Sequence, residues 1–150
     1  THTEAITLND REQGGTKTFT IASIADVYKR IVTCPASSDT TVATFQTLTS
    51  TSDNAIDLEL TKYIRVTNLD ASNSVNLSLQ VAGAEGGTAN MSTTILLAAG
   101  ESFAMGTPHD GIALSDASAG IVVSLNDLES ILIDPGSNAV AVEVFVASTA

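Results

Sequence analysis

The sequence predicts an all-β fold, an antiparallel β-sandwich of jelly-roll type with polar loops, formed as a single domain over residues 1–150. Thr, Val, Ile and Ser are abundant while Lys and Arg together number only 6, a composition that favours strands over helices. Strand-like segments alternate with turn residues at the spacing typical of sandwiches and barrels. A chain of this length can enclose one core, and we expect residues 1–15 to be extended.

The strand pattern is period two, in which one face of each strand is apolar and the other is polar. Ser, Asn, Asp, Gly and Pro separate these segments and favour turns. We expect strands at residues 5–9, 17–21, 27–33, 41–48, 55–60, 63–69, 75–81, 94–97, 101–105, 111–115, 121–125, 131–134 and 139–147.

The clearest pattern lies in residues 62–83, KYIRVTNLDASNSVNLSLQVAG. Val75, Leu77, Leu79 and Val81 alternate with Asn, Ser and Gln, and residues 70–74 have the composition of a turn. The stretch therefore predicts a β-hairpin. The carboxy-terminal segment, with Val at every second position from 140 to 146, is the next strongest strand.

Two segments allow a second interpretation. The even-numbered apolar residues from Ile56 to Val66 also fit one long strand over residues 55–69, interrupted near Lys62. Residues 21–32 also fit helical spacing. We favour a strand there because Thr and Ile dominate both ends.

Charge is distributed unevenly along the chain, whose net charge is −11. All six basic residues lie in residues 1–65 beside eight acids, whereas residues 66–150 carry nine acids and no base. Because phosphate binding depends on clustered Lys and Arg, this pattern predicts no binding to nucleic acid or to anionic membranes. The favoured explanation of the charge is solubility, because acidic groups keep a β-rich surface from self-associating. The functional alternative is a base-bearing side that docks on an acidic partner.

The sequence predicts no enzyme. His2 is terminal, and His109 lies in the turn-like Thr-Pro-His-Asp-Gly. Cys34, the single cysteine, is expected to be a buried, inert thiol. The glycine-rich residues 83–87 lack the Lys and helix of a phosphate-binding loop, so no cofactor is expected.

Metal ligands are a weaker alternative to turn chemistry in three loops. Residues 70–73, 116–118 and 134–138 offer Asp, Asn and Ser oxygens that calcium accepts. None has the spacing of an EF-hand, and the same residue types build ordinary turns. We predict turns and no metal.

The segments YIRVTNLDASNSVNLSLQV and TTILLAAGESFAMG carry a resemblance to a known class. Their "R-V-x-N" strand end (Arg65, Val66, Asn68) and "L-x-x-G-E-S-F" turn (Leu97, Gly100, Glu101, Ser102, Phe103) resemble the β-sandwich accessory proteins of tailed-bacteriophage virions, which decorate or cement the capsid. The likeness covers roughly residues 60–106. It implies a non-enzymatic structural protein that binds the major capsid protein and forms a homo-oligomer, with a trimer as the expected form.

Under this resemblance the expected shell-facing residues are Lys29, Arg30, Lys62 and Arg65. The amino terminus THTEAITLND has no secretory-signal pattern, so we expect assembly in the host cytoplasm and location in the virion. The alternative is a tail or head-fibre module, or a host-binding adhesin domain in which loops such as residues 82–92 meet a receptor.

Overall fold

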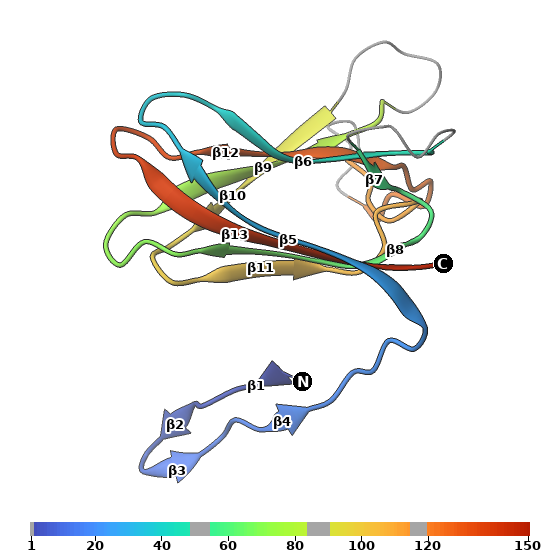
Figure 1. Ribbon diagram of the computed structural model, residues 1–150. Helices are drawn as coiled ribbons and strands as arrows, with labels where there is room; N and C mark the ends of the chain where they lie inside the picture. Colours follow the sequence, from blue (N-terminus) through green and yellow to red (C-terminus); the bar gives the residue numbers. More distant parts are fainter. Residues whose placement is uncertain (1, 49–54, 84–90, 115–119) are drawn as a thin grey trace.

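The protein is an all-β sandwich, as predicted. The computed structural model describes residues 2–48, 55–83, 91–114 and 120–150. Two sheets lie face to face, and the amino-terminal residues run away from them (Figure 1). Among the described residues no helix is long and apolar enough to cross a membrane.

The chain forms thirteen strands over these residues. One sheet has the order β11-β8-β13-β5 and the other β10-β9-β12-β6-β7, while β1-β4 and β2-β3 form two short ladders. The bounds are β1 His2–Thr3, β2 Thr7–Leu8, β3 Arg11–Glu12, β4 Thr16–Lys17, β5 Ile24–Cys34, β6 Thr40–Gln46, β7 Ile56–Asp57, β8 Thr61–Asn68, β9 Val75–Val81, β10 Met91–Leu97, β11 Ser102–Met105, β12 Leu128–Asp134 and β13 Val140–Thr149.

The sandwich has eight strands besides the two-residue β7. These eight strands pair in a nested order. In chain order the first pairs with the last (β5 with β13), the second with the seventh (β6 with β12), the third with the sixth (β8 with β11) and the fourth with the fifth (β9 with β10), all antiparallel. This nesting is the arrangement of a jelly roll. The short parallel pairing of β6 with β7 lies outside it.

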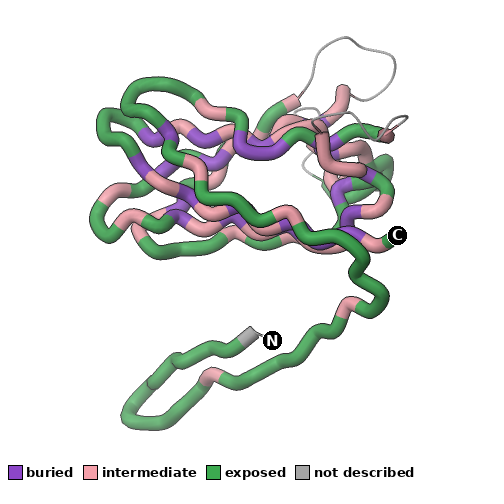
Figure 2. Tube along the Cα trace, in the orientation of Figure 1, coloured by how far each residue is buried: buried purple, intermediate pink, exposed green. Residues whose placement is uncertain are grey.

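The core lies between the two sheets and takes alternate residues from both. Ile64 and Val66 of β8 and Leu77 of β9 are fully buried, and Figure 2 shows buried positions recurring along the strands of both sheets. Burying each side chain of this size stabilises the fold by about 1.5–3 kcal/mol. The period-two alternation read from the sequence is therefore the alternation between core and surface.

The predicted hairpin over residues 62–83 is wrong. Both strands form, but β8 pairs with β11 and β13 while β9 pairs with β10 and β12, so residues 69–74 cross from one sheet to the other. Buried Asn68 fixes this crossing: its Nδ2 donates to the carbonyls of Asn73, Leu97 and Ala98 at 2.8, 3.2 and 3.1 Å. Its Oδ1 accepts from the Asp70 N–H at 3.0 Å.

Other expectations can be compared directly with the structure. The strand interpretation of residues 27–33 is confirmed in β5. Residues 55–69 do not form one strand, because a turn over residues 58–60 separates β7 from β8. Residues 111–114 and 121–125 form no strand among the described residues; Ile112 makes an isolated bridge with Asn126, and Ile121 and Val123 are almost fully exposed.

Residues 2–20, which we call the arm, lie outside the sandwich. The ladders β1-β4 and β2-β3 fold the arm back on itself, and residues 21–23 join it to β5. Figure 1 shows the arm as an open loop clear of both sheets. The strands predicted at residues 5–9 and 17–21 are reduced to these two-residue ladders, because neither segment pairs with a described strand of the sandwich.

Candidate interaction face

The outward side of the four-stranded sheet gathers basic and aromatic side chains. We call it the basic face; its members are Val27, Lys29, Ile31, Tyr63, Arg65, Glu143 and Phe145. They alternate along their strands with core residues such as Ile64 and Val144 and so point to the opposite side. The register sets Phe145 opposite both Lys29 on β5 and Arg65 on β8.

Glu143 is the acceptor that joins the two cations. Its Oε2 lies 3.1 Å from Lys29 Nζ, and Arg65 Nη2 donates to its Oε1 at 2.5 Å. The side chain of Glu143 is 15% exposed, against 58% for Lys29 and 37% for Arg65. The hydrogen bond from Lys29, reinforced by Arg65, lowers the pKa of Glu143. One carboxylate therefore meets two cations, and the cluster has a net charge of +1.

Aromatic rings give the basic face an apolar component. Tyr63 and Phe145 pack edge to face with centroids 6.1 Å apart, and the Arg65 guanidinium lies 5.5 Å from the Phe145 centroid. Val27 and Ile31 extend the apolar surface to the sheet edge, where both are exposed. Exposed apolar surface rimmed by charge is typical of protein interaction sites.

The structure brings together two of the four basic residues expected to contact a capsid. Lys29 and Arg65 meet on Glu143. Arg30 lies over the Tyr28 ring, 5.4 Å from its centroid, and so belongs to the other side of β5. Lys62, at the start of β8, donates to the Glu59 carbonyl at 2.8 Å. The predicted contact residues did not include Glu143, Tyr63 or Phe145.

The outward side of the five-stranded sheet is different in character. A shallow pocket of about 240 Å³ lies over β9 and β12, lined by Asp39, Asn76, Ser78, Gln80, Thr94, Leu132 and Asp134. We call these residues the polar face. All four bases of the sandwich lie in β5 and β8, whereas the strands of the five-stranded sheet contain three acids and no Lys or Arg.

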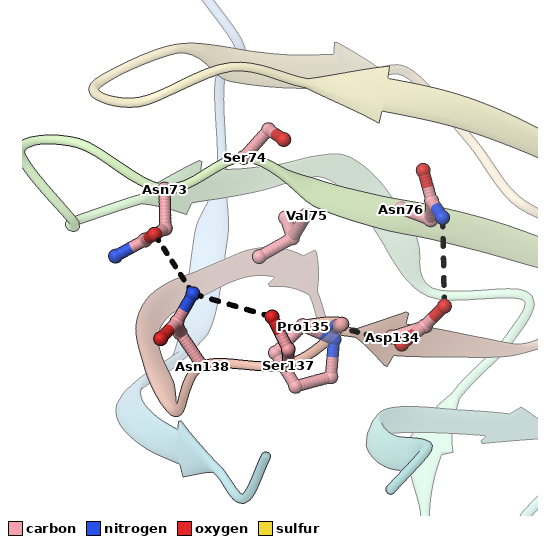
Figure 3. A pocket seen from close by; sticks show the side chains of 9 residues that line it. Asn73, Ser74, Val75, Asn76, Asp134, Pro135, Ser137 and Asn138 are labelled. Atoms are coloured by element: carbon pink, nitrogen blue, oxygen red, sulfur yellow. Dashed lines mark hydrogen bonds between the residues drawn. The ribbon is translucent and has the colours of Figure 1, made fainter. Parts of the chain in front are cut away.

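Two of the predicted turn loops meet at one end of the sandwich. Asn138 Nδ2 donates to Asn73 Oδ1 at 3.2 Å, beside a pocket of about 220 Å³ that also includes Asp134 (Figure 3). Asp70 Oδ1 accepts the N–H groups of Asn73 and Ser72, which lowers the pKa of Asp70. The carboxylates therefore close turns, as predicted. Residues 116–118 lie outside the described residues.

His109 has partners that its sequence context did not reveal. Its Nδ1 lies 3.0 Å from Asp127 Oδ1 and its Nε2 lies 3.5 Å from Asp110 Oδ2. Asp127 Oδ1 also accepts the Asp110 N–H at 2.9 Å. The three side chains offer ligand atoms within 4.8 Å of one another. The hydrogen bonds that Asp127 makes with the His109 ring and the Asp110 N–H join the loop at 107–112 to the start of β12.

Cys34 is fully buried at the end of β5, as predicted. Burial raises the pKa of its thiol. Because the thiolate is the reactive form, this environment disfavours nucleophilic chemistry at neutral pH.

The sequence matches no protein-family profile and no curated protein. One solved structure, from work on Bacillus endospore appendages that form a family of disulfide-linked pili, is similar over 89% of this chain and 100% of its own. Its sequence identity is 11% and the TM-score is 0.39.

Proposed function

We propose that this protein is a non-enzymatic structural protein of a bacteriophage virion, which binds the assembled capsid and stabilises it. The major capsid protein is its proposed partner, and a homo-oligomer its proposed form. The observation that carries the proposal is the separation of charge between the two sheets: the bases of the sandwich lie in one sheet and are absent from the other. One side is thus suited to an acidic surface and the other to solvent.

The geometry of the basic face supports a protein partner. Its cations are held in place by Glu143 and by the Phe145 ring, so less side-chain freedom is lost on binding. Aromatic residues and Arg are the types that dominate protein interfaces. Jelly rolls also occur in viral capsid proteins and lectins, although that is an analogy of fold alone.

Weak contacts suffice for such a role. A protein that binds assembled shell better than free subunits stabilises the shell by mass action. When several copies are joined, each further contact forms at high effective concentration, so the combined affinity exceeds that of a single site.

Co-sedimentation with capsids that lack this protein tests the proposal. The double variant Lys29→Ser/Arg65→Ser should lose most of its saturable binding, because it removes both cations from the basic face. The matched control Arg30→Ser/Lys62→Ser also removes two positive charges, but from positions outside that face, and should bind like the unmodified protein.

Three results would contradict the proposal. The unmodified protein could fail to bind capsids, or the two double variants could bind equally. Binding to phage tails or host cells in place of capsids would favour the tail-fibre or adhesin alternative.

A further inference from the structure

The arm carries apolar side chains without a core of its own. Its backbone is paired internally, with Glu4 N–H donating to Gly15 at 2.9 Å and Gln13 N–H to Ile6 at 2.6 Å. Ile6, Leu8 and Phe19 are each more than half exposed, and the exposed colouring of Figure 2 continues along nearly the whole arm. Isolated two-stranded ladders are at best marginally stable in water, so the arm requires a surface against which to order.

A surface of matching character is the free edge of β5. This strand of 11 residues ends the order β11-β8-β13-β5, so within the part of the chain that the structure describes β13 is its one neighbour in the sheet. Among the described residues its other edge has no partner strand. Val27, whose N–H donates to Asp26 Oδ1 at 2.8 Å, and Ile31 lie exposed beside that edge. A long edge of this kind is a template for strand addition by another chain.

The arm does not lie on the β5 edge of its own chain. Ser23 adopts a left-handed conformation with φ 59° just before β5 begins, and the chain turns away from the sheet there (Figure 1). The arm of a second copy is not joined to this β5 strand, so the turn at Ser23 does not keep it away from the edge. Its charge is also complementary: residues 2–20 contain three acids and two bases, whereas β5 contains two bases and one acid.

We propose that the arm of one copy adds to the free β5 edge of a second copy, burying Ile6, Leu8 and Phe19 against the apolar side chains of that edge. Each copy has one arm and one edge, so the contact is heterologous and repetition closes a ring or extends a filament. The contact joins copies of this chain and can be measured without capsids, but it uses Val27 and Ile31, which are also members of the basic face.

Sedimentation equilibrium of the full chain over a range of concentrations tests this contact. The unmodified protein should associate reversibly. Ile31→Lys should weaken association about tenfold or more, because it places a charge in the apolar contact. Leu96→Lys is the matched control: Leu96 is exposed to 64% and Ile31 to 65%, and Leu96 lies on β10, the edge of the other sheet. The control should associate normally.

Disulfide trapping gives an independent measurement that does not require a weakened variant. A Leu8→Cys copy mixed with an Ile31→Cys copy should form a linked pair under mild oxidation, since Cys34 is buried. Leu8→Cys mixed with Leu96→Cys should not. A monomer at all concentrations, equal association of Ile31→Lys and Leu96→Lys, or equal linkage to both cysteines would overturn the proposal. Association without capsid binding would refute only the proposed function.

Discussion

The outward sides of the two sheets occupy equivalent positions in the sandwich but present different chemistry. The basic face sets Lys29 and Arg65 around one carboxylate and beside two aromatic rings. The polar face presents Asn, Ser, Gln, Thr and Asp over β9, β10 and β12. Both sheets contribute alternate residues to the same core, so the difference lies wholly in the residues between the core positions. A fold can thus draw one common core from both sheets while the outward sides of those sheets carry different chemistry.

Both sheets depend on the shared core, so loss of a buried side chain from either sheet should have the largest effect on stability. Ile64→Ala in β8 and Leu77→Ala in β9 should each lower the free energy of unfolding by about 2–5 kcal/mol, because both side chains are fully buried. Chemical denaturation measures the loss. Leu96→Ala, at an exposed site of β10, should change stability by less than about 0.5 kcal/mol.

A small loss of unfolding free energy in only one of these two variants would show that the two sheets do not depend equally on the core. It would mean that one sheet is held by its own hydrogen bonds and adds little to the common interior.

The second prediction concerns the carboxylate that distinguishes the basic face. The pKa of Glu143 is lowered from its ordinary value of 4.5 by Lys29 and Arg65, so folding favours its charged form. Its contribution to stability is complete above pH 4.5 and is lost as the pH falls through the folded-state pKa. The unmodified protein should therefore lose more stability below pH 4.5 than the Glu143→Gln variant does. Thermal unfolding of both proteins across this pH range measures the difference.

Salt sharpens this measurement, because the three side chains are partly exposed and screening weakens their attraction. The difference between Glu143→Gln and the unmodified protein at neutral pH should shrink as salt is added. Parallel pH profiles for the two proteins would show that Glu143 stays equally charged in the folded and unfolded states.

The sequence predicted the strands better than their partners. Residues 75–81 match β9 because alternation directly reports a buried face. Alternation does not report which sheet that face belongs to, so the crossing at residues 69–74 was interpreted as a hairpin. Apolar character alone also predicted a strand at residues 121–125, where Ile121 and Val123 lie exposed.

The basic face could be predicted only in part for the same reason. Charge alone predicts Lys29 and Arg65 as contact residues. Glu143 lies 78 residues after Arg65, and only the pairing of β8 with β13 brings the two together. One available signal was the position of Glu143 between Val142 and Val144, which places a charged residue on the outward side of a buried strand.

The smallest effect is expected from a substitution on the polar face. It tests whether capsid binding depends on the arrangement of the basic face or only on net charge. Gln80→Lys gives the five-stranded sheet a base like those of β5 and β8, at a site where Gln80 donates to Ser78 Oγ at 2.8 Å. Stability should change by less than about 0.5 kcal/mol, because the site is on the surface. Capsid binding should be unchanged, since one cation on this sheet reproduces neither the Glu143 cluster nor its aromatic neighbours. If Gln80→Lys instead raised binding as strongly as the loss of Lys29 and Arg65 lowered it, net charge anywhere on the surface would govern binding, and the arrangement of the basic face would be irrelevant.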